Sequence, residues 1–218
     1  MKLKDRYEIK PISYKLAMEL VVKNHYLHRK CPCSQAFGLF EKCDNNTDLF
    51  SNERIVGCVI YGTPSSAPLR KGICGIDESS NVLELTRLWI EDDTPKNTES
   101  YFISQCHKWI KQNTDIEVIV SFADLEEGHT GVIYKASNFE YLGETAKARI
   151  LMVDGKEYHA RSLNQKARPY GRELKRRFDS GDENIFYVNR KPKHIYVYYL
   201  NKKIKRQIKK LDFIKNNS

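Results

Sequence analysis

The sequence has no apolar run long enough to cross a membrane, and its first residues, MKLKDRYEIKPIS, lack the apolar stretch of a signal peptide. No low-complexity segment and no internal repeat is visible. Six cysteines are irregularly spread, and nothing else in the sequence suggests secretion. We therefore expect a cytoplasmic protein with reduced thiols and no membrane partner.

Positive charge is concentrated in the last third of the 218 residues. Residues 1–143 hold 17 Lys and Arg against 20 Asp and Glu, a balance of −3, whereas residues 144–218 hold 20 against 8, a balance of +12. Such a segment predicts a polyanion partner, most commonly nucleic acid. The alternative is a solvated tail that only improves solubility. The length allows one large domain, or a domain with an appendage.

Strand and helix patterns alternate along the first two thirds of the chain. Apolar spacing predicts helices over 14–24, which Ser13 would cap, and over about 98–111, with a short helix near 128–137. Loops are expected at the polar segment 43–52 and the Gly/Pro/Ser-rich segment 62–75. The expected strands are at 7–13, 34–42, 54–62, 81–90, 117–124 and 138–144. This order predicts an α/β layer rather than a sandwich.

The basic third of the chain has its own pattern. Residues 148–160 predict a hairpin that turns at Asp154-Gly155. A basic helix over 171–179, an aromatic strand over 194–200 and a lysine-rich run over 201–211 follow. We expect a core domain at 1–145 and a basic extension at 146–218 that packs on the core and contacts DNA.

Charged residues interrupt the apolar strand expected at 81–90. With strict alternation, Leu83, Leu85, Arg87 and Trp89 share one face of this strand, and Glu84 lies on the other. Burying an unpaired charge is costly, so each charge needs a partner. Arg87 is then a candidate for holding a phosphate or carboxylate in a cleft, and the alternative is a structural ion pair.

Five sequence blocks carry a resemblance to a known family. The order of elements resembles the GNAT (N-acetyltransferase-like) fold, and GVIYKASNF is similar to the closing helix–strand segment of that fold. HYLH, ELTRLW with TPKNTES, SFAD, GVIYKASNF and KHIYVYYLNKK together resemble the Mom family of bacteriophage DNA modification proteins. The likeness covers roughly residues 8–210. It implies an α/β GNAT-like fold, with a mixed central sheet flanked by helices.

The resemblance also implies a function. Mom proteins convert adenine to N6-(carbamoylmethyl)adenine, which shields phage DNA from host restriction endonucleases. It implies double-stranded DNA with a flipped adenine as the partner, Fe(II) and acetyl-CoA or another small donor as cofactors, and allows a homodimer. One departure is that DDTPKNT, at the place of the glycine-rich pyrophosphate loop of GNAT enzymes, contains no glycine.

Candidate site residues follow from the matched blocks. The resemblance assigns catalysis to Asp124, Tyr134, Arg87 and Ser121, and an iron site to His25, Asp124 and Tyr134. Donor binding is assigned to Arg87, Asn97, Glu99 and Ser100. The structural alternatives are an N-cap for Asp124, a core aromatic for Tyr134 and a helix cap for His25.

Aromatic and basic residues are the candidates for contacting DNA. They are Tyr26, Arg168, Arg172, Lys175, Arg176, Arg177, Lys202, Lys203, Lys205 and Arg206.

Three other readings stay open. The chain could be a GNAT acyltransferase acting on a protein, tRNA or small amine, or a catalytically inactive nucleic-acid-binding module. His25, His28, Cys31 and Cys33 lie close enough in sequence for zinc, although C-x-C is tighter than the usual spacing, and ordinary reduced thiols are the preferred interpretation.

Overall fold

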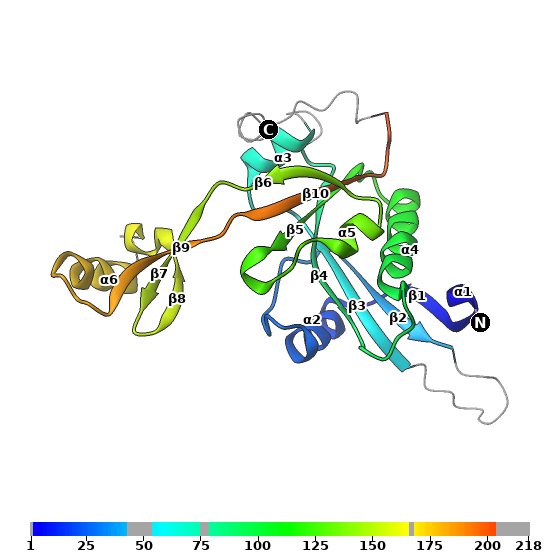
Figure 1. Cartoon of the computed structure of the whole chain (residues 1–218), viewed down its shortest axis with the longest axis horizontal. Helices are drawn as coiled ribbons and strands as arrows, with labels where there is room; N and C mark the ends of the chain where they lie inside the picture. Colours follow the sequence, from blue (N-terminus) through cyan, green and yellow to red (C-terminus); the bar gives the residue numbers. More distant parts are fainter. Residues whose placement is uncertain (1, 43–53, 75–78, 166–167, 204–218) are drawn as a thin grey trace. The chain divides into compact units, whose positions relative to one another are not determined.

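The structure, a computed structural model, describes residues 2–42, 54–74, 79–165 and 168–203 (Figure 1). The chain forms two compact units. The first comprises Met1–Phe122, Gly131–Gly143 and Ile195–Ser218, and the second comprises Ala123–Thr130 and Glu144–His194. None of the helices in the described ranges is long and apolar enough to cross a membrane.

A seven-stranded sheet with the order β1-β2-β3-β4-β5-β10-β6 is the centre of the first unit. Neighbours from β1 to β4 are antiparallel, whereas β4 and β5 are parallel, so the predicted mixed sheet is confirmed. The strands are β1 (Tyr7–Pro11), β2 (Gln35–Glu41), β3 (Arg54–Gly62), β4 (Val82–Ile90), β5 (Val118–Asp124), β6 (Glu140–Glu144) and β10 (Lys193–Tyr199).

Helices cover both faces of this sheet. On one face, α2 packs on Ile60 and Trp89, and α3 packs on Val82 and Val118. On the other face, α4 places His107 against Tyr61, and α5 contacts α4 (Figure 1). The helices of this unit are α1 (Leu3–Arg6), α2 (Tyr14–Asn24), α3 (Ala67–Cys74), α4 (Thr98–Asn113) and α5 (Val132–Ala136).

Most predicted elements are confirmed, and one expected loop is wrong. Ser13 caps α2, and its side chain accepts a hydrogen bond from the backbone N–H of Leu16. The segment 62–75, expected to be a loop, contains α3. Pro68 is tolerated there because it lies in the first turn, and Leu69 and Ile73, one helical turn apart, pack on the core. The loop expected at 43–52 lies outside the described residues.

The expected alternation along β4 is also wrong, because the register with β3 shifts at Thr86. Ile60 pairs with Arg87, but the next residue, Tyr61, pairs with Leu85. Thr86 is therefore the extra residue of a β-bulge, which reverses the faces that follow it. Arg87 consequently lies with Ile60 on the α2 face, opposite to the face of Leu85.

The second unit has a separate core and a three-stranded sheet of order β8-β7-β9. The predicted hairpin is confirmed, since β7 and β8 pair across Asp154-Gly155, both at positive φ. The sequence reading did not anticipate β9, which pairs with β7. The elements are β7 (Ala148–Val153), β8 (Lys156–His159), β9 (Ile185–Arg190), α6 (Pro169–Asp179), and the 3₁₀ helices η1 (Leu125–Glu127) and η2 (Ala160–Asn164).

The boundary expected between residues 145 and 146 lies close to Glu144, where the main segment of the second unit begins. The chain returns to the first unit at Ile195, so most of β10 belongs to that unit.

Candidate active site

The two parallel strands at the centre of the sheet pair over only a short stretch. Val82–Glu84 pair with Val118–Val120, and the ladder goes no further along these two described strands. Beyond the paired stretch, β4 continues with Leu85 and the bulge at Thr86, and β5 continues with Ser121. Open α/β sheets bind ligands at the carboxyl ends of their strands, so this split is the natural position for a site.

Tyr134 and Ser121 connect across the split. The hydroxyl of Ser121 lies close enough to that of Tyr134 to influence its pKa. Ser121 is fully buried, and its Oγ donates a 3.0 Å hydrogen bond to the carbonyl oxygen of Leu85 on β4. Two of the four predicted catalytic residues, Tyr134 and Ser121, therefore lie close together.

Burial is the largest influence on the Tyr134 hydroxyl and raises its pKa. The Ser121 hydroxyl lowers the pKa, while the nearby Tyr26 and Glu84 raise it, and the net shift is upward. The ring is held between Phe139 and Tyr196, at centroid distances of 5.4 and 5.2 Å. Tyr134 is thus a neutral phenol at pH 7 in a fixed position, which makes it a hydrogen-bond donor.

His25 and Tyr26 form a stacked pair at the end of α2. Their ring centroids are 4.3 Å apart; His25 is buried, and Tyr26 is 45% exposed. The capping role weighed for His25 is confirmed, because His25 is the C-cap residue of α2. Its Nδ1 also accepts a 3.1 Å hydrogen bond from the N–H of Leu27, so the proton of the neutral ring lies on Nε2.

Asp124 ends β5 and belongs to the second unit. One carboxylate oxygen caps η1 by accepting a 3.1 Å hydrogen bond from Glu126 N–H, which confirms the capping alternative. The other oxygen forms an ion pair of 2.7 Å with Nζ of Lys193. Burial disfavours the ionised carboxylate and would raise the pKa of Asp124. The hydrogen bond and charge of Lys193, together with the hydrogen bond from Glu126 N–H, outweigh burial, so the pKa is lowered.

Each residue of the predicted iron trio already has other interactions. Nδ1 of His25 is already an acceptor, the phenol of Tyr134 is neutral, and the carboxylate of Asp124 is paired with Lys193. A metal would need a deprotonated ligand set.

Zinc has no ligand cluster in the described ranges. They contain no group of three or more His, Cys, Asp or Glu side chains that could hold a metal. Cys31 and Cys33 are free thiols, and Nδ1 of His28 hydrogen-bonds to the carbonyl oxygen of Val22 at 3.0 Å.

Arg87 has unused hydrogen-bonding capacity. Its Nη1 donates a 2.6 Å hydrogen bond to the carbonyl oxygen of Thr86. Its Nε is buried and has no hydrogen-bond partner among the described residues. A guanidinium in this state suits a carboxylate or phosphate ligand. The alternative role for Arg87 was a structural ion pair. No ion pair of Arg87 is found among the described residues.

The beginning of α4 adjoins a small cleft of about 230 Å³ that Asn97 and Ser100 line. Asn97 adopts φ 70, the left-handed conformation that a glycine would supply, and its side chain makes no capping hydrogen bond. Ser100 Oγ donates to the carbonyl oxygen of Asn97 at 3.1 Å. These two candidates for donor binding share a cleft, whereas Glu99 and Arg87 do not line it.

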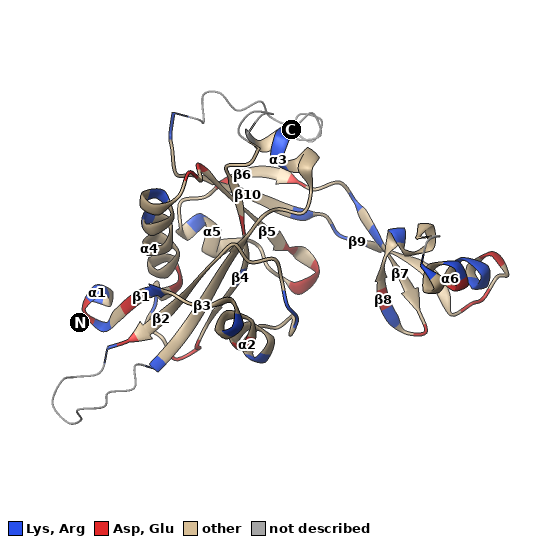
Figure 2. Ribbon diagram, turned by 180° about the vertical axis from the view of Figure 1, so that it is seen from behind, with Lys and Arg blue, Asp and Glu red and all other residues tan. Residues whose placement is uncertain are grey.

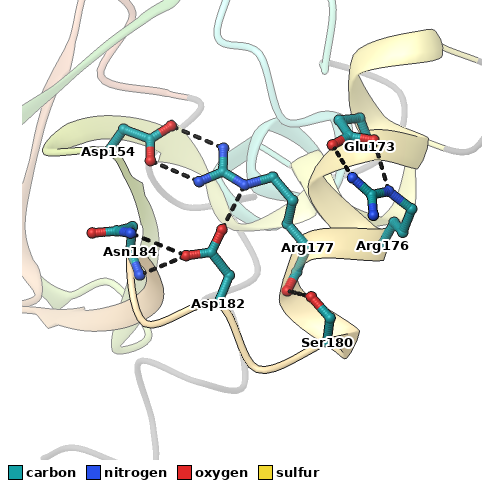
Figure 3. Close-up of polar contacts among 7 residues, drawn as sticks. All are labelled: Asp154, Glu173, Arg176, Arg177, Ser180, Asp182 and Asn184. Carbon is teal, nitrogen blue, oxygen red and sulfur yellow. Dashed lines mark hydrogen bonds and ion pairs between the residues drawn. The ribbon is translucent and has the colours of Figure 1, made fainter.

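Lys and Arg are prominent on α6 (Figure 2). Several of these residues, predicted to contact DNA, already have acidic partners. Arg177 binds Asp154 through both terminal nitrogens, at 2.9 and 2.7 Å, and donates from Nε to Asp182 at 2.6 Å (Figure 3). Arg176 pairs with Glu173, and Lys175 with Asp179. Arg177 therefore has a structural role within the second unit.

Other predicted contacts are more accessible. Arg168 and Arg172 are exposed at the start of α6, and Lys202 and Lys203 are exposed after β10. Lys205 and Arg206 lie outside the described residues.

Sequence reasoning missed three features near the sites. Lys193 was not expected to pair with Asp124, because the two residues lie far apart in sequence. Tyr196, which packs on Tyr134, was read only as part of an aromatic strand. His107 was not noticed, although it lies within the apolar pattern of α4 next to Cys106.

Comparison with known proteins identifies relatives over nearly the whole chain. Residues 6–215 match the Mom protein family. Methylcarbamoylase mom of Escherichia phage Mu is 27% identical over 201 residues, which cover 92% of this chain and 78% of the phage protein.

Solved structures of other proteins are similar to this chain. The spermidine/spermine N-acetyltransferase SpeG from Vibrio cholerae, solved with manganese ions, superposes with a TM-score of 0.50 at 7% identity, covering 94% of this chain and 99% of SpeG. YncA from Salmonella typhimurium, solved with its cofactor acetyl-CoA, gives a TM-score of 0.46 at 9% identity, covering 90% and 95% of the two chains. The GNAT-like α/β fold expected from the sequence is confirmed.

Proposed function

The chain belongs to the Mom protein family, and from this premise we propose that it is a transferase that converts adenine in DNA to N6-(carbamoylmethyl)adenine. The modification would protect the DNA from host restriction endonucleases. The similarity to the methylcarbamoylase of phage Mu supports this proposal. The structural observation that carries it is the connection from Tyr134 through Ser121 to Leu85 at the split between β4 and β5.

The chemistry requires an accessible and activated base. The N6 lone pair of adenine is conjugated with the ring, so this nitrogen must lose a proton as it attacks. The base must also leave the helical stack, at a cost of a few kcal/mol. The exposed ring of Tyr26 offers a surface on which a displaced base can stack. Tyr134, a neutral phenol, can donate a hydrogen bond that fixes the base or the donor.

Two groups of residues are suited to the donor. Arg87 would bind a carboxylate or phosphate through its buried, unpartnered Nε. Asn97 and Ser100 would hold a polar part of the donor in the cleft at the start of α4. Acetyl-CoA held there would supply the two-carbon unit. Its conversion into a carbamoylmethyl group would further need a two-electron oxidant at the methyl carbon and ammonia to displace the thiol of CoA.

The test is to express the protein in a bacterium and to examine deoxyadenosine from its digested DNA by mass spectrometry. We expect a modified deoxyadenosine whose mass is higher because a carbamoylmethyl group replaces one hydrogen on N6. Tyr134→Phe should lower its yield by about 100-fold or more, the usual range for loss of a proton-transferring or donating group. Tyr14→Phe is the matched control, since Tyr14 is 55% exposed on α2.

Asp124→Asn tests the carboxylate charge separately, because an amide oxygen can still cap η1. Loss of modification in this folded variant would assign Asp124 a role in the reaction. Unmodified DNA in cells that contain folded wild-type protein would reject the proposal. Acetyl transfer to a protein, tRNA or polyamine without DNA would instead favour the acyltransferase reading.

A further inference from the structure

A second cleft, of about 470 Å³, lies between the C-terminal half of α4 and the end of β10. Lys108 and Lys111 reach it from α4, and Lys202 and Lys203 reach it from the turn after β10. We call it the lysine cleft. Its described lining includes no Asp or Glu. Four like charges around one concavity repel each other and attract an anion.

The turn that carries Lys202 and Lys203 is held in place by Glu117 at the start of β5. The N–H groups of Leu200 and Asn201 donate to the carbonyl oxygen of Glu117 at 2.9 and 3.3 Å. Nδ2 of Asn201 donates to the Glu117 carboxylate at 3.0 Å, and its Oδ1 accepts from Lys203 N–H at 3.0 Å. The two lysines are therefore presented from an anchored turn.

His107 forms part of the cleft wall and has unsatisfied polar atoms. It is 2% exposed, and neither ring nitrogen has a hydrogen-bond partner among the described residues. Three aromatic rings contact it. Their centroids lie 5.9 Å (Tyr61), 5.5 Å (Phe139) and 4.4 Å (Tyr198) from the centroid of the His107 ring. Burial lowers the pKa of His107 to about 3, so the ring is neutral and offers one donor and one acceptor. Buried polar groups normally have partners, so this one indicates a ligand.

The lysine cleft also adjoins the cleft at the start of α4. Ser104, His107 and Tyr198 line both. An anion bound among the lysines would therefore lie beside the candidate donor site. The lysine cleft is larger than one phosphate requires. Mobile ammonium groups contact phosphates without distinguishing one base sequence from another. A chain of phosphates fits these properties better than a single small anion.

We propose that the lysine cleft binds the phosphate backbone of the DNA substrate, with the His107 ring as a hydrogen-bonding group on its wall. This inference rests on the proposed function, which makes DNA the substrate. It adds Lys108 and Lys111, on the first unit, to the contacts expected from the basic last third of the chain.

The test measures binding of the full-length protein to a labelled DNA duplex by fluorescence anisotropy at several KCl concentrations. Each phosphate contact contributes a slope of about −0.9 to the logarithmic salt dependence of affinity. Lys108→Ala/Lys111→Ala should make the slope shallower by about 2 and weaken binding at least several-fold. Lys15→Ala/Lys71→Ala, which removes two exposed lysines from α2 and α3, is the matched control and should change neither value.

His107→Phe separates the ring from the charges. It should weaken DNA binding without changing the salt slope, because the ring is neutral. An unchanged affinity and slope in Lys108→Ala/Lys111→Ala would overturn the proposal. Displacement of the duplex by micromolar inorganic pyrophosphate at constant ionic strength would also overturn it, in favour of a small polyphosphate ligand.

Measuring adenine modification in parallel distinguishes the two proposals. Wild-type modification with lysine-independent DNA binding would reject the lysine cleft alone. Lysine-dependent DNA binding without any modified adenine would support the cleft as a DNA site and reject the proposed chemistry.

Discussion

Tyr134 and His107 show at the scale of single residues how burial determines what a polar side chain can do. Burial keeps both groups neutral at pH 7, by raising the pKa of the phenol and lowering that of the imidazole. Tyr134 has Ser121 as a partner, whereas His107 has none among the described residues. Tyr134 is therefore held in place beside Ser121, whereas neither ring nitrogen of His107 is engaged by a described side chain.

His107 makes stability depend on pH. Its pKa is about 3 when folded and about 6.5 when unfolded, so the unfolded state binds more protons between these values. The free energy of unfolding should consequently fall as the pH drops below 6.5, by about 1.4 kcal/mol per pH unit from this residue. Urea unfolding at pH 7.5 and 5.0 measures this fall.

His107→Phe should remove that contribution, and His129→Gln, at an exposed position, should retain it. The same pH dependence in wild type and His107→Phe would contradict the assignment.

Arg177 and Arg176 are neighbours on α6 with different roles. Arg177 joins the β7–β8 turn to the loop before β9 through Asp154 and Asp182 (Figure 3), whereas Arg176 pairs with Glu173 one turn away on the same helix. Arg177→Ala should lower the midpoint of thermal unfolding more than Arg176→Ala does. Calorimetry of both variants tests this order, and equal midpoints would refute it.

Residue identities at the candidate site could be proposed from the sequence, but their partners could not. The block containing Tyr134 and the strand containing Ser121 were recognisable, and the structure brings these two together. The Asp124–Lys193 pair joins two residues of the second unit that lie far apart in the sequence, and no local pattern encodes such a pair. His107 looked like one polar residue in an amphipathic helix, because burial is visible only after folding.

At the scale of elements, the close approach of α5 to β10 positions Tyr134. Gly131, the N-cap of α5, has φ +78, and a Cβ there would lie 2.3 Å from the ring of Tyr196. Gly131→Ala should reduce the free energy of unfolding by roughly 2–4 kcal/mol, from left-handed strain and the clash. It should also lower adenine modification by displacing α5.

Gly128→Ala separates the two causes in urea unfolding. Gly128 has φ +72, but a Cβ there has no atom within 4 Å, so only the strain of roughly 1–2 kcal/mol applies. Equal destabilisation by the two substitutions would show that contact with Tyr196 does not matter.

Elements with a strong period were predictable, and those that depend on tertiary pairing were not. The apolar spacing of α2 gave its bounds, Tyr14–Asn24, because one face packs on the sheet. The bulge at Thr86 depends on the register with β3, so alternation placed Arg87 on the wrong face. In α3, the Gly and Pro content concealed the spacing of Leu69 and Ile73.

At the scale of the whole molecule, the two units have separate apolar cores. Val120 lies in a core of the first unit, and Leu151 lies in the core of the second. Leu151→Ala should cost about 2–5 kcal/mol, because Leu151 is fully buried. Hydrogen exchange should then accelerate in β7, β9 and α6 and stay unchanged in β2 and β3. Uniform acceleration throughout the chain would show that the two units unfold together.

The position of β10 in the sheet has a consequence for synthesis. β10 lies between β5 and β6, although it is the last strand within the described residues. While the ribosome makes the 55 residues from Thr145 to Tyr199, the facing edges of β5 and β6 have no partner. At 5–20 residues per second, this interval lasts roughly 3–11 s. Unpaired strand edges are prone to aggregation, so the nascent chain is most vulnerable in that interval, and a chaperone that covers it would increase the yield of folded protein.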